Sequence, residues 1–346
     1  MKGKGKKRLR NFLILLLSII MLAAGTICIY ADNLLSKINF TADDPAAVKV
    51  ETGSLFKPGT QSTPESAKSG VLAGLFHDDA ITNILLLGTD DYQVDDVGRS
   101  DSMMLVSVDT RHKKLKITSF MRDLYVAIPG HGSNKLNAAY SEAGGGAAGA
   151  ALVTHTIEAN FGVDIDRYVL IRDSAFPKII DRLGGVTVTL TSGEAQLVNE
   201  YCGDPKSHLT AGTFNLNGAQ AHYYSRIRAI GNDYARTQRQ RTVFASLVNK
   251  LKSASLSTIY GALADTLNLV STNLSKDEIV TMASHSLTYL NYPLTQDRIP
   301  GDNQFHSETI SGAGDSLVPN LDACRKNISS FIYENDLPKK SYQTEN

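Results

Sequence analysis

The sequence predicts an α/β protein: a layered α-β-α domain with a central mixed sheet flanked by helices, behind a single N-terminal transmembrane helix. Three observations predict it. A long apolar segment follows a basic N-terminus, short apolar runs typical of strands recur between residues 84 and 190, and segments with helical spacing lie among and after them. The composition, 42% hydrophobic and 20% charged, is that of a folded protein and excludes a disordered or fibrous one.

The N-terminal segment predicts a membrane anchor. The first ten residues carry six basic side chains and no acidic one, and residues 11–31 carry no charge. As a helix, 11–31 spans about 30 Å, the thickness of a bilayer core. We therefore predict a basic cytoplasmic segment at 1–10 and an uncleaved transmembrane anchor at 11–31, because the apolar run is longer than a signal-peptide core. The rest of the chain is then extracellular, held at the cell membrane by this single span.

Residues 32–77 are predicted to be an extracellular linker, since most of the segment is rich in small and polar residues and three prolines interrupt it. The catalytic domain is predicted at 78–346. Three cysteines are too few for a disulfide-dense scaffold or a cysteine-based zinc module. Two of them, Cys202 and Cys324, lie in the domain, and the sequence leaves open whether they pair.

Strands and helices alternate through the domain. Apolar or alternating patterns predict strands at 84–88, 103–108, 115–120, 124–128, 168–171 and 186–190. Helical spacing predicts helices at 147–161, 233–252, 256–270 and 321–333. Because the run at 84–87 is continuously apolar, its strand is expected to be covered on both faces, with helices on both sides of the sheet.

Several familiar functions are excluded or disfavoured. The sequence has no nucleophile elbow, no P-loop and no H-E-x-x-H motif. Gly144-x-Gly146-x-x-Gly149 matches a dinucleotide fingerprint, but residues 137–142 before it lack the strand pattern that this motif needs, so we interpret it as a glycine-rich entry to a helix. Residues 11–346 carry a net charge of −6 and no helix-turn-helix signal, which argues against nucleic-acid binding.

Acidic and basic side chains gather where three predicted strands begin or end. They are Asp90, Arg99, Asp101, Arg122 and Asp123. If the strands are neighbours, these residues converge, and two nearby carboxylates repel each other unless a cation lies between them. Oxygen ligands without histidine or cysteine suit a hard cation such as Mg²⁺. Ordinary turn and cap aspartates are an equally consistent reading of the spacing.

A second, basic cluster begins at Arg226 and Arg228, which face the same way if the segment is extended. It continues on the helix at 233–252, where Arg236 and Arg239 share a face in the first turns. Arginine is unfavourable at a helix N-terminus unless an anion binds there, and its forked guanidinium fits phosphate oxygens. The cluster thus predicts a phosphate site; the alternative is a solvated basic face paired with surface carboxylates.

Together the two clusters predict phosphoryl chemistry on a pyrophosphate, with Mg²⁺ and arginine neutralising the charge that develops on the leaving phosphate. Asp123 or Asp233 is the candidate base that takes a proton from the attacking hydroxyl. Nucleoside triphosphates are scarce outside the membrane, so a lipid-linked pyrophosphate is the expected substrate.

Several stretches occur in an order that is shared with one protein family. They are residues 83–90 (NILLLGTD), 99–109 (RSDSMMLVSVD), 122–123 (RD) with 128–130 (IPG), 135–140 (KLNAAY), 184–188 (GGVTV), 224–228 (YSRIR) and 233–240 (DYARTQRQ), with weaker matches from 300 to 333. In these stretches and in its N-terminal anchor the chain resembles the LytR–CpsA–Psr proteins, cell-wall glycopolymer ligases typical of Gram-positive bacteria.

The resemblance implies an Mg²⁺-dependent phosphotransferase that moves a glycopolymer from a polyprenyl pyrophosphate carrier to a sugar hydroxyl of peptidoglycan, leaving a phosphodiester. It also implies a hydrophobic pocket for the lipid tail. By the family's motifs, Asp90 and Asp101 are the expected Mg²⁺ ligands, and the pyrophosphate is expected to contact Arg99, Arg122, Arg226, Arg228, Arg236 and Arg239. The expected catalytic residues are Arg122, Asp123 and Asp233, with either aspartate as the base.

The chain departs from the family pattern at three places. Met121 stands where a proline usually precedes the Arg-Asp pair, residues 91–93 lack a frequent arginine, and Arg172-Asp173-Ser174 stands where Asp-Phe is more usual. These departures bear on headgroup or acceptor preference rather than on the reaction class. The alternative function is a non-catalytic, regulatory protein that binds polyprenyl phosphate or wall polymer, because a binder needs the same arginines. The transferred polymer, whether teichoic acid, capsule or another wall glycan, is not indicated by the sequence.

Overall fold

The computed structural model describes the folded part of the chain. The described residues are 36–41, 75–89, 97–202, 208–231, 233–255, 258–259, 261 and 265–334. The predicted segments 1–10 and 11–31 lie outside them, as does Asp90, and only the backbone of Asp233 is described. Among the described helices, none is both long enough and apolar enough to cross a membrane.

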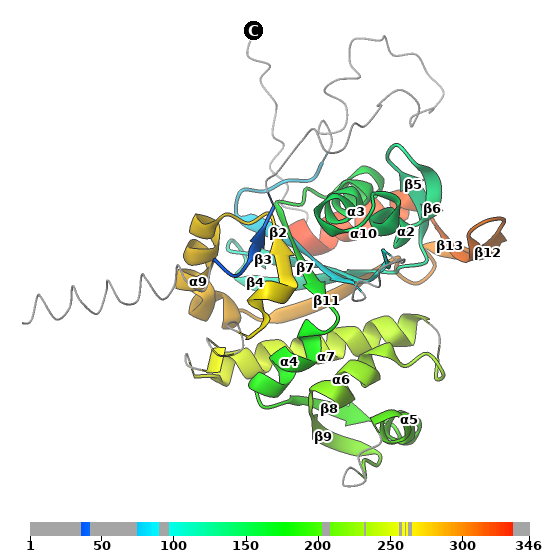
Figure 1. Ribbon diagram of the computed structural model, residues 1–346. Helices are drawn as coiled ribbons and strands as arrows, with labels where there is room; N and C mark the ends of the chain where they lie inside the picture. The colour runs from blue at the N-terminus through cyan, green and yellow to red at the C-terminus, as the bar shows by residue number, and fades with distance from the viewer. Residues whose placement is uncertain are drawn as a thin grey trace, which may run out of the picture.

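A seven-stranded mixed sheet forms the centre of the domain (Figure 1). Its strands, in spatial order, are β1 (Asn39–Phe40), β10 (Val270–Thr272), β7 (Arg167–Arg172), β2 (Ile81–Thr89), β3 (Ser100–Asp109), β4 (Lys114–Phe120) and β11 (Leu294–Ile299). β2 pairs antiparallel with β3 and parallel with β7, and β4 pairs parallel with β11. The predicted α/β class with a central mixed sheet is confirmed.

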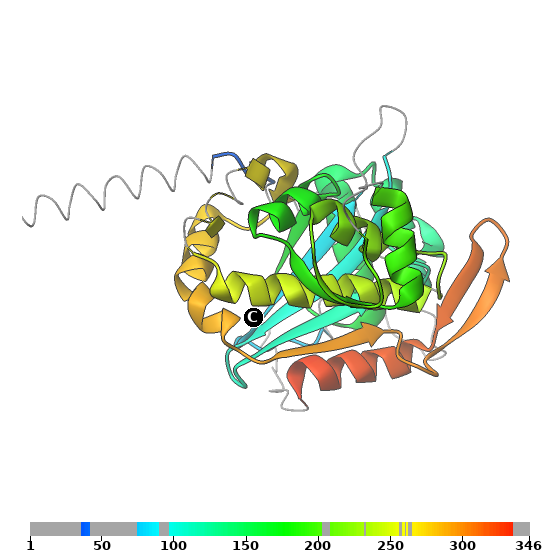
Figure 2. The ribbon, with the colours of Figure 1, turned by 90° about the horizontal axis from the view of Figure 1, so that it is seen from below.

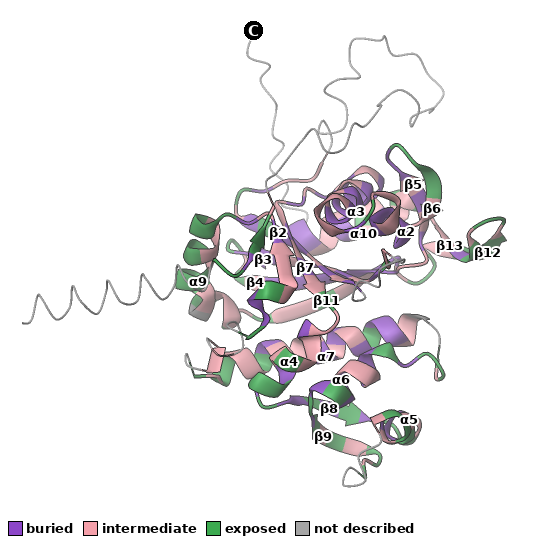
Figure 3. Cartoon of the chain, viewed as in Figure 1, coloured by how far each residue is buried: buried purple, intermediate pink, exposed green. Residues whose placement is uncertain are grey.

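Helices cover both faces of this sheet (Figure 1). On one face lie α2 (Ala138–Glu142), α3 (Gly146–Phe161) and α10 (Leu321–Tyr333), and on the other α4 (Ala175–Arg182), α6 (Gly218–Arg226) and α7 (Asp233–Ser253). Side chains alternate along β2 and β3, so Leu85, Leu87 and Leu105 enter the main core, where Ile157 and Phe161 of α3 meet them. Figure 3 shows the buried residues concentrated on the sheet and on the inner sides of these helices.

A second, smaller core lies beneath α4, α6 and α7. It is completed by α5 (Ser192–Cys202) and by the antiparallel hairpin β8 (Val186–Leu190) with β9 (Gly212–Leu216). Val243 of α7 is fully buried in it, beside Val186 and Leu216. Figure 2 shows α7 running across the sheet from below. The helix is therefore held between two hydrophobic layers, and that fixes the direction of its arginines.

Most predicted elements are present with similar bounds. The strand predicted at 124–128 is β5 (Tyr125–Ile128), which pairs with β6 (Gly132–Lys135) outside the central sheet. The helix predicted at 256–270 is wrong at its C-terminal end. There Leu267–Leu269 form a 3₁₀ turn and Val270–Thr272 form β10, antiparallel to β7. The helical spacing of this segment is weak, and the hydrogen bonds that the segment makes with β7 favour a strand over a helix. β-branched Val270 and Thr272 also suit a strand.

Several elements have no counterpart among the strands and helices that the sequence predicted. They include β11, α9 (Lys276–Leu290) and the hairpin of β12 (Phe305–Ile310) with β13 (Gly314–Pro319), which projects from the domain in Figure 2. β11 pairs with β4 over its full length and forms an edge of the sheet. β4 therefore has a partner on both sides where it ends, just before Arg122.

The glycine-rich stretch enters a helix, as predicted. The short helix α2, not a strand, precedes it, and α3 begins at Gly146. A Cβ on Gly149 would lie 2.6 Å from the carbonyl oxygen of Tyr140, so glycine is required there for α3 to pack against α2. This close packing accounts for Gly149 without a nucleotide.

Part of the segment predicted as a linker contacts the fold. Asn39 and Phe40 form β1, which pairs parallel with β10. Phe76 forms a bridge with Val163 and packs against the main core. Farther along the chain, Cys202 and Cys324 are not joined by a disulfide. Burial raises the pKa of the Cys324 thiol to about 11.

Candidate active site

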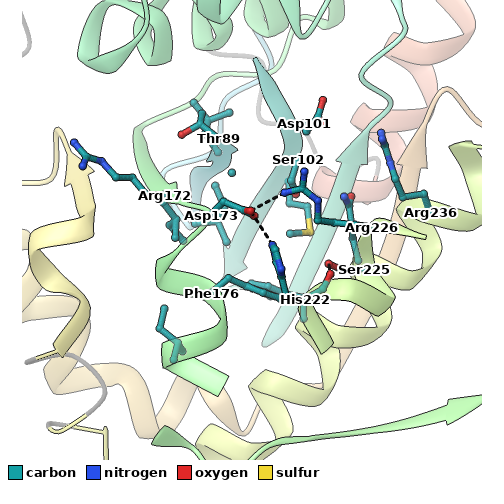
Figure 4. A pocket seen from close by; sticks show the side chains of 18 of the residues that line it. Thr89, Asp101, Ser102, Arg172, Asp173, Phe176, His222, Ser225, Arg226 and Arg236 are labelled. Atoms are coloured by element: carbon teal, nitrogen blue, oxygen red, sulfur yellow. Dashed lines mark hydrogen bonds and ion pairs between the residues drawn. The ribbon is translucent and has the colours of Figure 1, made fainter. Parts of the chain in front are cut away.

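A cavity of about 160 Å³ lies below the ends of β2 and β7, against α4, α6 and α7 (Figure 4). Much of its lining is apolar and includes Leu86, Met104, Ile171, Phe176, Ile179, Phe244 and Leu247. Its polar side chains include Thr89, Asp101, Ser102, Arg172, Asp173, His222, Ser225, Arg226, Arg228, Arg236 and Gln240. β2 and β7 are parallel, so their carboxyl ends meet at this edge of the sheet, where α/β proteins commonly bind ligands.

Asp101 links two arginines at the start of β3. The register between β2 and β3 shifts here, so that Gly88 pairs with Ser102 and Thr89 with Ser100, and Asp101 is the extra residue of a bulge. Its Oδ1 accepts a hydrogen bond from Nη1 of Arg122 and its Oδ2 one from Nη2 of Arg228, both 3.0 Å long. Three segments distant in sequence therefore meet at one carboxylate.

The ionisation of Asp101 follows from these contacts. Burial by itself would raise the pKa of Asp101, but the guanidinium groups of Arg122, Arg236 and Arg228 outweigh burial and hold the pKa below its usual value. Asp101 is therefore a carboxylate at neutral pH.

Arg122 and Asp123 directly follow β4. The Asp123 carboxylate lies between two cations, with Oδ2 3.4 Å from Nε of Arg122 and Oδ1 3.2 Å from Nζ of Lys135. Its backbone carbonyl accepts a hydrogen bond from the amide of Leu317 in β13. The projecting hairpin therefore helps to fix the segment that carries Arg122. Neither Arg122 nor Asp123 is among the described lining residues of the cavity, and Arg122 is joined to that lining through Asp101.

Three arginines of the second cluster enter the cavity from different places. Arg226 ends α6, Arg228 lies between α6 and α7, and Arg236 lies near the start of α7. Arg226 donates from Nη1 to Asp173 at 2.6 Å, whereas Arg228 donates to Asp101. Arg236 is only 3% exposed and Arg239 only 5%, so the alternative of a solvated basic face does not hold for these two arginines, whereas Arg226 and Arg228 are exposed.

The structure turns Arg239 away from the cavity lining. Its Nε donates to Glu194 of α5 at 2.7 Å, and Nη1 and Nη2 donate to the carbonyl oxygens of Ile227 and Ile230 at 3.0 and 2.9 Å. Arg239 therefore fixes the connection that carries Arg228. Arg99 is exposed just before β3 and is not among the described lining residues.

Asp173 and His222 line the cavity, although the sequence did not predict them as site residues. Asp173 follows β7, and its amide donates to the carbonyl oxygen of Thr89 at 2.9 Å. Its Oδ2 accepts a hydrogen bond from Nη1 of Arg226 and lies 2.8 Å from Nε2 of His222, with which it is also hydrogen-bonded (Figure 4). The sequence did contain a signal for Asp173 as a site residue. Like Asp90, it lies two residues after a predicted strand, and its stretch departs from the family pattern.

Two clusters of side chains in the described part of the chain could hold a metal. Each combines one histidine with two carboxylates whose ligand atoms lie close together: His77 with Asp164 and Asp166, and His112 with Asp109 and Glu334. Neither set lines the cavity. The acidic side chains in the described cavity lining are Asp101 and Asp173. Each carboxylate oxygen has two acceptor directions, so Asp101 can bind its arginines and still contact a hard cation.

Fold and cavity define a class of protein: an α/β domain in which the ends of sheet strands meet a cavity lined by apolar side chains and arginines. Such a cavity suits a ligand that has an anionic group and an apolar part. A family model described as the LytR_cpsA_psr family matches residues 49–323. The chain therefore belongs to the LytR–CpsA–Psr family.

Related proteins narrow the comparison. The chain is 34% identical over 257 residues to the polyisoprenyl-teichoic acid–peptidoglycan teichoic acid transferase TagU of Oceanobacillus iheyensis, an alignment that covers 73% of this chain and 76% of that protein. A structure of TagT bound to LIIa-WTA is similar with a TM-score of 0.60 at 26% identity, covering 74% of this chain and 92% of that one. A structure of TagT with bound octaprenyl pyrophosphate lipid is similar with a TM-score of 0.56 at 25% identity, covering 74% and 91%.

Proposed function

We propose that this protein is a polyisoprenyl-teichoic acid–peptidoglycan transferase of the LytR–CpsA–Psr family. It takes teichoic acid from a polyprenyl pyrophosphate carrier and joins it to a sugar hydroxyl of peptidoglycan through a phosphodiester. The observation that carries this proposal is the cavity, whose lining combines apolar side chains with Arg226, Arg228 and Arg236. The TagU relative and the lipid-bound TagT structure support it.

The arginines would bind the pyrophosphate, and the apolar side chains would contact the prenyl chain. Arg236 is almost completely buried, so its attraction for a phosphate is weakly screened by water. Asp101 orients Arg122 and Arg228 before substrate arrives. When the acceptor hydroxyl attacks the phosphorus that bears the glycan, these arginines stabilise the charge on the departing lipid phosphate.

Magnesium is the metal we propose for this site, with Asp101 and Asp90 as its ligands. The proposal is supported by the ionised carboxylate of Asp101 and by the position of Thr89, the residue before Asp90, in the cavity lining. Bound Mg²⁺ would neutralise charge on the pyrophosphate. Asp123, which already contacts Arg122, and Asp233 are the two proposed bases. In the transfer assay, Asp123→Asn should abolish product if Asp123 is the base, and Asp233→Asn should do so if Asp233 is.

The proposed location is the cell membrane, with a single span at 11–31, the N-terminus in the cytoplasm and the catalytic domain outside. The basic and apolar N-terminal segments support it. So does the chemistry, because an enzyme that modifies peptidoglycan needs its active site on the outer side of the membrane.

The test uses the full-length protein in detergent with Mg²⁺, a prenyl pyrophosphate-linked teichoic acid precursor and a peptidoglycan oligomer. Mass spectrometry should detect a glycan–peptidoglycan phosphodiester that disappears with EDTA, with Arg236→Ala and with Asp101→Asn. Arg182→Ala and Asp277→Asn are matched controls outside the cavity and should keep activity. Carrier binding without product, even with natural substrates, would instead support the regulatory binder.

A further inference from the structure

The cavity contains a carboxylate that the proposed reaction does not use. Asp173 stands beside the arginines, and its contact with Arg226 is shorter than either arginine contact of Asp101. Figure 4 shows Asp173 between Arg226 and His222, with Phe176 close by. The amide of Phe176 donates to the carbonyl of Asp173 at 3.2 Å, and the amide of Asp173 donates to Thr89. Its backbone is therefore held between the end of β2 and the start of α4.

The charge on the lipid phosphate changes during the proposed reaction. In the substrate, both phosphates of the pyrophosphate are diesters, and each carries one negative charge. The acceptor hydroxyl attacks the glycan-bearing phosphorus and loses its proton, the bond from that phosphorus to the bridging oxygen breaks, and the bridging oxygen stays on the lipid phosphate. The lipid phosphate becomes a monoester, whose second ionisation has a pKa of about 6, so it gains most of a second negative charge at neutral pH.

We propose that Asp173 is a specificity-determining residue that disfavours the lipid monophosphate product relative to the pyrophosphate substrate. This inference rests on the proposed function. A bound phosphate draws Arg226 away from Asp173, and the carboxylate then faces the phosphate without that counter-ion. Because like charges repel in proportion to their product, the cost rises when the lipid phosphate gains its second charge. Asp173 thereby promotes release of the product and recovers Arg226 for the next cycle.

His222 keeps the carboxylate in place during this exchange. Its Nε2 lies 2.8 Å from the Asp173 oxygen that also contacts Arg226, so one hydrogen bond remains when the arginine leaves. His222 belongs to α6, as does Arg226, one turn farther on. The carboxylate is therefore tied to the same helix that presents the arginine.

Binding measurements test the proposal directly. The full-length protein in detergent is titrated with farnesyl phosphate and with a farnesyl pyrophosphate ester of one N-acetylhexosamine. Asp173→Asn keeps the shape and removes the charge, so it should bind the monophosphate about tenfold more tightly, while affinity for the pyrophosphate ester changes less than threefold. Asp277→Asn makes the same charge change on an exposed residue outside the cavity and should alter neither constant.

Turnover gives a second readout. In the transfer assay Asp173→Asn should show stronger inhibition by added farnesyl phosphate and a lower kcat, with KM for the carrier nearly unchanged. Thermal unfolding checks that the variant is folded, and Asp173→Ser repeats the test without an amide. Equal weakening of both ligands would mean that Asp173 only positions Arg226 and would overturn the proposal, as would unchanged affinities. A wild-type protein that binds neither lipid would overturn the proposed function itself.

Discussion

Replacing Arg239 by alanine should destabilise the domain by about 3–5 kcal/mol, the range for breaking a buried ion pair from one side. Arg239 is 5% exposed and Glu194 8% exposed, so neither group is well solvated. The alanine variant leaves the Glu194 carboxylate without its guanidinium and leaves the carbonyl oxygens of Ile227 and Ile230 without their donors. Each lost contact carries a desolvation cost.

Thermal and urea unfolding of the full-length protein in detergent measure this loss. At roughly 2–4 °C per kcal/mol, the midpoint should fall by about 10 °C. Arg182→Ala is the matched control, because that arginine and its partner Asp265 are 57% and 40% exposed, and removing the pair should change stability by less than about 1 kcal/mol. A loss below 1 kcal/mol for Arg239→Ala would refute the buried role that the structure gives it.

Glu194→Gln separates charge from shape at the same contact. Burial alone would raise the pKa of Glu194, but hydrogen bonds from Thr191 and Arg239 outweigh burial and lower it. A group with a lowered folded pKa stabilises the fold above its unfolded pKa and stops doing so as the pH falls through the folded pKa. The variant should therefore lose about 1–2 kcal/mol at pH 7 and progressively less below about pH 4. A penalty that does not depend on pH would exclude the charge as its source.

Three further predictions concern other parts of the fold. Burial, with smaller contributions from neighbouring aspartates, raises the pKa of Glu158 to about 8. Wild type therefore loses stability as the pH rises from about 4.5 to 8, because Glu158 ionises more readily in the unfolded chain than in the folded one. Urea titrations should show Glu158→Gln gaining stability relative to wild type across that window. Cys324 is buried with a raised thiol pKa, so peptide mass spectrometry should find it alkylated more slowly than Cys202 in the native protein, and equal rates would contradict its burial. Gly149→Ala should cost about 1–3 kcal/mol in thermal unfolding because its Cβ has no room, whereas Gly261→Ala, whose Cβ meets nothing within 4 Å, should be close to neutral.

The central strands were predictable because they are buried on both faces. β2 and β3 carry apolar runs that no exposed segment of similar length would tolerate, and their bounds extend only a few residues beyond the prediction. β11 was missed because an edge strand is only partly covered: its sequence, Leu-Thr-Gln-Asp-Arg-Ile, contains four consecutive residues with polar or charged side chains, none of them fully buried. β10 is three residues long and exists through its partners rather than through its own pattern.

The candidate site was predictable in part for a similar reason. The expected convergence of Asp101 with Arg122 rested on neighbouring strands, and β3 and β4 are indeed paired and joined by that ion pair. Helical spacing correctly placed Arg236 and Arg239 one turn apart, but spacing on one helix does not reveal what packs against it. Arg239 faces α5, an element that the sequence did not predict, so its spacing could not reveal its ion pair with Glu194.

The described arginines of the site are not an open positive patch. Arg122 and Arg228 contact Asp101, and Arg226 contacts Asp173, so the protein supplies two anions of its own where a ligand's phosphates would bind. Of the three, Arg122 needs its counter-ion most, because its side chain is only 20% exposed and an unpaired buried charge is costly, whereas Arg226 and Arg228 are 44% and 57% exposed. A phosphate that binds there then replaces a carboxylate as the partner of an arginine. The binding free energy reflects only the difference between the phosphate–arginine contact and the carboxylate–arginine contact that it replaces. A ligand with two adjacent phosphates can engage the arginines of both carboxylates, whereas a single phosphate can engage those of one.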